Sequence, residues 1–145
     1  MTPEEFLNQK DEQLIVEAIR EAEKDTSGEI RVHLEKNNTI PSQERAVQVF
    51  KELGMQHTAQ KNGVLFYIDV DNKVFSILGD QGINEIVPAD FWESIKEIVI
   101  NHFKQKNYAL GLVKGIREVG QKLKEYFPYK SDDVNELPDE ISKNY

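Results

Sequence analysis

The stretch VLFYIDV at residues 64–70 is apolar at almost every position, and a second strand-like stretch follows at 73–78. A strand this apolar is typical of the centre of a sheet that is covered on both faces. Asp71 and Asn72, between the two stretches, tolerate positive φ and can join them as a tight hairpin. The sequence therefore predicts a buried pair of antiparallel strands that helices must cover.

The segments around this hairpin supply those helices and one more strand. Ile30, Val32 and Leu34 alternate with polar residues, which predicts a strand over residues 29–35 with one solvent-facing side. Apolar stripes with three- and four-residue spacing predict helices at 11–24, at 42–53, from Pro88 or Asp90 to about 103, and at 107–126.

The order of these elements indicates the fold class. A helix lies between the strands at 29–35 and 64–70, so these strands should be joined by a right-handed crossover and lie parallel. We therefore predict an α/β fold with a small mixed sheet. Its first two strands are parallel, its second and third form the hairpin, and about four helices sandwich it.

Length and composition limit the organisation of the chain. Its 145 residues suffice for one domain with a hydrophobic core. We expect that domain over residues 1–127. Residues 128–145 are polar, hold two prolines and lack periodicity, which predicts a flexible tail.

Charge and missing residue types exclude several classes of function. A net charge of −8 opposes binding to nucleic acid. The lack of cysteine excludes disulfides and thiolate chemistry. No apolar run approaches the ~20 residues of a membrane span, and the start MTPEEFLNQKDEQ does not resemble a signal peptide. We expect a cytoplasmic monomer without direct membrane insertion and without an organic cofactor.

Asp69 and Asp71 end an apolar strand with one residue between them, which resembles the first motif of the haloacid-dehalogenase phosphatases. In that family a threonine or valine stands two residues after the second aspartate, where this sequence has Lys73. The other motifs of the family are not found after Asp80. Turn chemistry alone accounts for both aspartates, so we favour a hairpin turn.

Four other segments carry a wider resemblance: EAEKDTSGEIRV, LGMQHTAQKNGVLFYI, FSILGDQGI and KQKNYALGLVKGI, in this order. Together they resemble the TPM domain, a family named for a plant thylakoid lumen protein, a photosystem II repair protein and a nematode receptor-associated protein. The segment NELPDEI near the end resembles one bacterial subgroup.

The resemblance implies a small α/β sandwich. For some members it also implies calcium binding and acid phosphatase activity, whereas other members act as accessory factors without known chemistry. Many members carry a signal sequence or membrane anchor that is not found here, so a cell-envelope location is not expected.

The predicted topology divides the polar residues between two ends of the sheet. Glu29 and Asn62 begin the two parallel strands and lie at one end. The hairpin register sets Val64 opposite Gly79, which returns Asp80 to that same end. Oxygen ligands from several loops are what Ca²⁺ or Mg²⁺ requires. We therefore predict Glu29, Asn62 and Asp80 as metal ligands.

Further candidates lie close to this end. Glu23 and Gln81 are additional candidate ligands, and Asp80 and His57 are the candidates for acid–base catalysis.

The opposite end holds Glu35, Asp69 and Asp71, with Asp69 paired to Val74. It lies roughly 20 Å away at ~3.3 Å per strand residue. Rules for open α/β sheets favour that opposite end. The segments that resemble the TPM domain converge on the first end of the sheet. We therefore prefer the first end as the location of the functional site.

Two functions stay open. The first is a non-catalytic, divalent-metal-binding interaction or accessory domain for a membrane-associated or stress/repair complex. The second is a metal-dependent acid phosphatase acting on phosphomonoesters, with Glu29 and Asp80 as ligands. The sequence favours the first, with an unidentified protein as partner.

Overall fold

The computed structural model describes residues 3–36, 39–129 and 136–144. The elements, in chain order, are α1 (Pro3–Phe6), α2 (Gln9–Ala22), β1 (Glu29–Glu35), α3 (Ser42–Glu52), the 3-10 helix η1 (Met55–His57), β2 (Gly63–Asp69), β3 (Val74–Gly79), α4 (Gln81–Asn84), α5 (Glu93–Lys104), α6 (Tyr108–Leu123) and β4 (Ser142–Asn144). Among these helices, none has the length and apolar character needed to cross a membrane.

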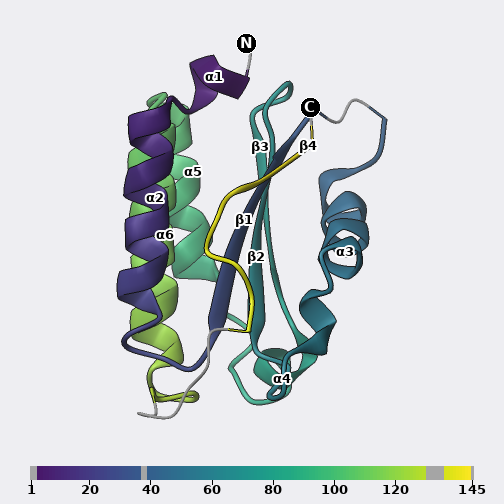
Figure 1. The fold of residues 1–145 in the computed structure, drawn as a ribbon, viewed down its shortest axis with the longest axis vertical. Coiled ribbons are helices and arrows are strands. Elements are labelled where there is room, and N and C mark those ends of the chain that lie inside the picture. The colour runs from purple at the N-terminus through teal and green to yellow at the C-terminus, as the bar shows by residue number, and fades with distance from the viewer. Residues whose placement is uncertain (1–2, 37–38, 130–135, 145) are drawn as a thin grey trace.

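The strands form one mixed sheet between two helical layers. Its order is β3-β2-β1-β4, with β1 parallel to β2 and to β4, and β2 antiparallel to β3. Helices α2, α5 and α6 cover one face, and α3 covers the other (Figure 1). The predicted α/β class, the mixed sheet and the helices on both faces are confirmed.

The predicted hairpin register is confirmed: Val64 pairs with Gly79, and Asp69 pairs with Val74. The turn over residues 70–73 differs in detail, because the residue with positive φ is Lys73, at 55°. Asp69 organises this turn. Its Oδ1 accepts from the N–H of Asp71 at 3.1 Å.

Two apolar clusters lie on either side of the sheet. The larger one fills the space between the sheet and α2, α5 and α6. The smaller one lies beneath α3 and includes Ala46, Phe50, Met55 and Tyr67. Helix α2 begins at a capping box, in which Asn8 Oδ1 accepts from the N–H of Asp11 at 2.8 Å.

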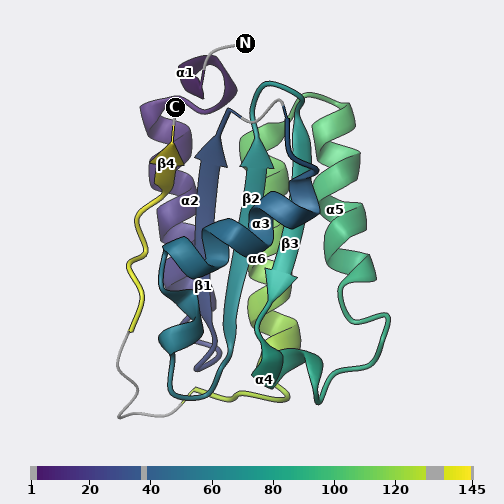
Figure 2. The same ribbon diagram turned by 90° about the vertical axis from the view of Figure 1, so that its right-hand side faces the viewer.

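Part of the predicted tail, residues 136–144, lies against the sheet. Residues 136–144, called here the C-terminal segment, run along the free edge of β1 (Figure 2). Ser142 in β4 pairs with His33 in β1. Leu137 is buried in the cluster beneath α3. The tail also contains residues 130–135, which lie outside the described residues.

Because the C-terminal segment and α3 cover it, β1 has no solvent-facing side. Arg31 is half-buried, and the other six residues of the strand are buried. The alternation in its sequence is real, but its polar side faces other parts of the protein instead of water.

Gly82 in α4 packs closely against the backbone of Gln60 and Lys61. A Cβ there would lie 2.2 Å from the carbonyl oxygen of Gln60 and 2.6 Å from that of Lys61. We expect Gly82→Ala to lower the free energy of unfolding by about 1–3 kcal/mol, because backbone must move to make room. Urea denaturation measures this. The exposed Glu85→Ala should stay within about 0.5 kcal/mol of wild type, and equal effects of both would contradict the steric argument.

Candidate functional site

The backbone brings the predicted metal ligands to the amino ends of β1 and β2. The N–H of Glu29 donates to the carbonyl oxygen of Asn62 at 3.2 Å, and the N–H of Asp80 donates to that of Gly63 at 2.9 Å. Glu29, Gly63 and Asp80 therefore lie in a row at one end of the sheet. The topology expected from the sequence is present, while the metal-binding roles stay predictions.

Only some of the polar side-chain atoms of Glu29, Asn62 and Asp80 have hydrogen-bond partners within the described residues. Glu29 Oε1 accepts from the N–H of Leu137 at 2.7 Å. Asp80 Oδ1 accepts from the N–H of Gln81 at 2.7 Å and caps α4. Glu29 Oε2, Asp80 Oδ2 and Asn62 Nδ2 are buried and have no hydrogen-bond partner within the described residues.

The other candidate residues, Glu23, Gln81 and His57, differ in their hydrogen bonds and exposure. Glu23 Oε2 accepts from the N–H of Ile30 at 3.1 Å. The exposed Gln81 donates to Glu85 at 2.8 Å. His57 is exposed at the end of η1. Glu23 thus follows α2, Gln81 begins α4 and His57 ends η1.

The TPM resemblance implies Ca²⁺ or a related ion, which takes about 6–8 oxygen ligands. Over residues 3–36, 39–129 and 136–144, no three Asp, Glu, His or Cys side chains are placed to hold a metal ion. The unpartnered carboxyl oxygens at this end are one each on Glu29 and Asp80. As placed, these residues do not fit a divalent cation.

Two carboxyl groups at this end retain protons unusually well. Burial raises the pKa of Glu29 to about 7, although the N–H groups of Leu137 and Glu136 lower it in part. Burial, followed by a side-chain hydrogen bond with Asp139, raises the pKa of Glu23 to about 9. The ordinary pKa of a glutamate is 4.5. These groups are therefore neutral over a pH range in which most carboxyl groups are charged.

The opposite end of β1 holds a buried charged network that sequence reasoning missed. Glu35 is 2% exposed. Arg45 on α3 donates to both of its oxygens, from Nε at 2.6 Å and from Nη2 at 3.0 Å. The hydroxyl of Tyr67 donates at 2.7 Å, and His33 Nε2 lies 2.9 Å away. Burial would raise the pKa of Glu35, but the hydrogen bonds from Arg45, Tyr67 and His33 outweigh it and lower the pKa to about 2.

This network fixes the protonation of His33. An ionised Glu35 can only accept, so His33 Nε2 carries the proton and donates it. Burial lowers the pKa of His33, which favours the neutral ring, and in that tautomer Nδ1 accepts from the hydroxyl of Ser142 at 2.9 Å. The i, i+2 spacing of His33 and Glu35 on one strand face was the available sequence signal. Nothing local pointed to Arg45 or Ser142.

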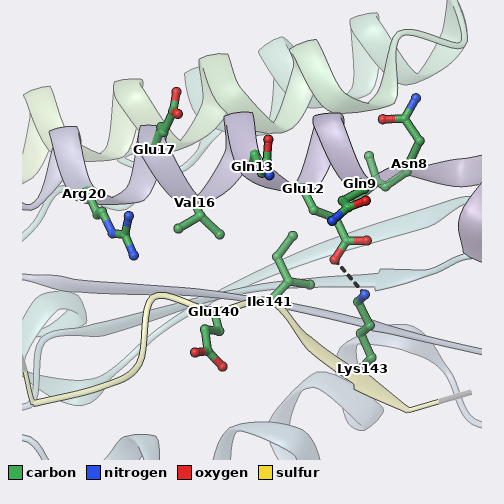
Figure 3. A pocket seen from close by; sticks show the side chains of 11 residues that line it. Asn8, Gln9, Glu12, Gln13, Val16, Glu17, Arg20, Glu140, Ile141 and Lys143 are labelled. Atoms are coloured by element: carbon green, nitrogen blue, oxygen red, sulfur yellow. Dashed lines mark ion pairs between the residues drawn. The ribbon is translucent and has the colours of Figure 1, made fainter.

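A surface groove lies between α2 and the C-terminal segment (Figure 3). Its volume is about 1140 Å³. Val16 on α2 and Ile141 on the C-terminal segment point toward each other across it, and Lys143 bridges its two walls through an ion pair with Glu12 at 2.6 Å. Because the C-terminal segment supplies one wall, the groove exists only while that segment is in place.

The TPM domain model matches residues 1–122. The chain therefore belongs to the TPM-domain family. A comparison with curated proteins finds no match.

Solved structures share the fold. The BA42 protein from the psychrophilic bacterium Bizionia argentinensis is similar, with 51% identity and a TM-score of 0.93 over 99% of both chains. That coverage includes most of the C-terminal segment. The N-terminal domain of a protein from P. gingivalis has 23% identity and a TM-score of 0.67, over 84% of this chain and 79% of that one. The N-terminal domain of the cg2496 protein from Corynebacterium glutamicum has 13% identity and a TM-score of 0.63, over 96% and 80%. The last two show the fold alone.

The network around Glu35 makes stability depend on pH in a defined direction. Its pKa is depressed from an ordinary value of 4.5 to about 2. The stabilisation is therefore complete above about pH 4.5 and is lost as the pH falls toward 2. We expect Arg45→Met to cost about 3–5 kcal/mol near neutral pH, because it leaves a buried carboxylate without its charge partner.

Urea denaturation of wild type and Arg45→Met between neutral and acidic pH measures this dependence. The difference between the two proteins should shrink as acid protonates Glu35. The exposed Arg117→Met on α6 is the control and should change stability by less than about 0.5 kcal/mol at every pH. A difference that stays constant down to acidic pH would contradict the assigned role of Glu35.

Proposed function

We propose that this TPM domain is a non-catalytic interaction domain that docks a membrane-associated protein in the groove between α2 and the C-terminal segment. The observation that carries the proposal is the groove itself, in which the apolar side chains of Leu7, Val16 and Ile141 lie among eight polar or charged lining residues. An open apolar surface with a polar rim is typical of a protein–protein interface.

The charges around the groove define the partner. The lining carries three glutamates, Glu12, Glu17 and Glu140, against Arg20 and Lys143. Lys143 is paired with Glu12, and Arg20 with Asp139 at 3.6 Å. The groove is therefore net acidic, as is the chain. Its occupant is a segment with apolar side chains flanked by arginine or lysine, a composition that is frequent next to transmembrane helices on the cytoplasmic side.

The roles of the candidate catalytic residues also favour binding over catalysis. Asp80 uses one oxygen to cap α4, and His57 is exposed in η1. General acid–base catalysis needs both groups within reach of one reacting atom. Asp80 lies at the start of α4 and His57 at the end of η1.

A short amphipathic Arg/Leu peptide tests the docking surface. We expect amide cross-peaks of residues around Val16 and Ile141 to shift and saturate on titration with this peptide, and not with a Glu/Leu peptide of equal length. Val16→Lys should weaken binding by about tenfold through like-charge repulsion. Val47→Lys, the same change on exposed α3, should not. Equal binding of both peptides, or no shift at millimolar concentration, would refute the proposal.

A metal-dependent phosphatase is the alternative function. The observation that favours it is the pair of unpartnered buried oxygens, Glu29 Oε2 and Asp80 Oδ2, at one end of the sheet. If a cation binds after local rearrangement, these are the atoms through which it would be held.

Amide NMR titration with Ca²⁺ and Mg²⁺ after chelator treatment tests this alternative. Saturable shifts confined to the segments around Glu29, Asn62 and Asp80, with turnover of p-nitrophenyl phosphate that Asp80→Asn abolishes, would establish it. The asparagine retains a capping oxygen for α4 and removes only the charge. Since these residues as placed do not fit a cation, we expect no saturable shift there and no turnover.

A further inference from the structure

A second groove, called here the helix groove, lies between α2 and α6 at the surface of the helical layer. Its volume is about 860 Å³. Leu14 on α2 and Leu110 on α6 belong to its two walls, and each is 46% exposed. Single leucines on a surface need no partner, but two on the walls of one groove form an apolar patch that favours burial. The helix groove therefore offers apolar surface to a partner.

The charged residues of the helix groove are divided between its walls by sign. The wall of α1 and α2 carries only acidic residues, and the wall of α6 and the loop before it carries only basic ones. The acidic residues are Glu5, Asp11, Glu17 and Glu21, and the basic residues are Lys106 and Arg117. Within the part of the chain that the structure describes, neither Glu17 nor Arg117 has an ion-pair partner. An occupant must therefore present basic groups to one wall and acidic groups to the other.

The two helices that form these walls pack against each other and run in the same direction. Phe6, shortly before α2, stacks on Tyr108 at the start of α6, with 4.4 Å between the ring centroids. Near the other end, a Cβ at Gly120 would lie 2.8 Å from that of Ala22, the last residue of α2. The helices therefore lie side by side with their first turns at one end of the groove and their last turns at the other.

This parallel packing sets the heights of the groove residues along the helices. Glu17 lies five residues before Ala22, and Arg117 lies three residues before Gly120. At about 1.5 Å per residue, Glu17 and Arg117 differ in height by about 3 Å, which is less than one helical turn. The same count gives about 3 Å for the two leucines. Each charge and each leucine on one wall thus has its counterpart at nearly the same height on the other.

The helix groove is complementary to a second copy of itself. A two-fold axis along the groove keeps the direction and height of each helix and exchanges the two walls. It places α2 of each copy over α6 of the other, so that acidic walls meet basic walls and leucines meet leucines. A contact in which both copies use the same surface patch is the commonest arrangement in protein dimers. No other partner is needed to match both walls.

We propose that two copies of this chain associate as a symmetric dimer through the helix groove. Leu14 of each copy packs on Leu110 of the other, and Glu17 of each copy pairs with Arg117 of the other. This dimer departs from the monomer expected from the sequence, in which the opposite charges of α2 and α6 stand about a hundred residues apart. It goes beyond the proposed docking function and stands independently of it.

The size of the two helices limits the strength of the dimer. Helix α2 has 14 residues and α6 has 16, which makes them about 21 and 24 Å long. Two such helices about 10 Å apart cover less than the roughly 800 Å² that each partner of a stable complex usually buries. The net charge of −8 on each copy also opposes association. We therefore expect a dissociation constant on the order of 100 µM.

Sedimentation equilibrium of the full chain between about 10 µM and about 1 mM measures this association. We expect the average mass to rise with concentration from that of one chain toward that of two. Leu110→Ala should raise the dissociation constant at least about tenfold, because the symmetric contact is lost twice. Val47→Ala, which also shortens an exposed apolar side chain but lies on α3, should leave it within about twofold.

Charge reversal identifies the walls that meet. Arg117→Glu sets acidic side chains against each other in the dimer, and Glu17→Arg sets basic ones against each other. Each variant alone should associate at least about tenfold more weakly than wild type. An equimolar mixture of the two variants should form a mixed dimer, because both of its contacts then join a positive to a negative side chain. An ion pair within one chain cannot produce this recovery on mixing.

Two variants on the other face of the sheet are the matched controls. Glu44→Arg and Lys51→Glu change the same charges on the exposed side of α3, and each should leave the dissociation constant within about twofold. A mass of one chain at about 1 mM would refute the dimer. A dimer that persists in both Arg117→Glu and Glu17→Arg, or two such variants that do not associate when mixed, would refute its location in the helix groove.

Val16→Lys separates the dimer from the docking function, because Val16 lines the other groove. We expect this variant to dimerise as wild type does, within about twofold, while its binding of the Arg/Leu peptide weakens. A dimer that binds no peptide would refute the docking function and leave the dimer intact. Peptide binding by a protein that stays a single chain would refute the dimer and leave the docking function intact.

Discussion

The arrangement of this domain depends on the burial of one carboxylate, that of Glu35. A buried carboxylate is stable only when donors and charges surround it. Glu35 draws Arg45 from α3, Tyr67 from β2, and His33, which Ser142 of β4 holds from the far side. One side chain thus ties three other elements to β1. This explains why α3 lies over the carboxyl end of the strand and why β1 has a neighbour on each edge.

Much of the fold was predictable because its determinants are local. The apolar run before Asp69 could only be a central strand, and a turn of fixed length set Val64 opposite Gly79. Apolar stripes located α2, α3, α5 and α6 to within a few residues, apart from the start of α5. Strand direction then placed Glu29 and Asp80 at one end of the sheet. Local pattern and connection rules together therefore gave the architecture without any knowledge of side-chain contacts.

The sequence did not predict contacts between residues that lie far apart in the chain. The alternation of 29–35 predicted a solvent-facing side, since polar residues on a strand usually meet water. Here they meet Arg45 and the C-terminal segment, with His33 and Ser142 separated by 109 residues in sequence. The segment itself is polar and has no periodicity, so nothing local marks it as a strand. Its attachment is visible only when its partners on β1 are known, and the same holds for the groove that it helps to form.

Strand β1 compensates buried carboxyl groups in two different ways at its two ends. At Glu35 the guanidinium of Arg45 balances the buried charge. Arg45 keeps its own charge at any pH that the fold survives. That end is fixed from mildly acidic pH upward. At Glu29 and the neighbouring Glu23, bound protons do so, and protons leave as the pH rises. Arg45 ties α3 to β1 through Glu35, whereas Glu29 holds the C-terminal segment by accepting from the N–H of Leu137.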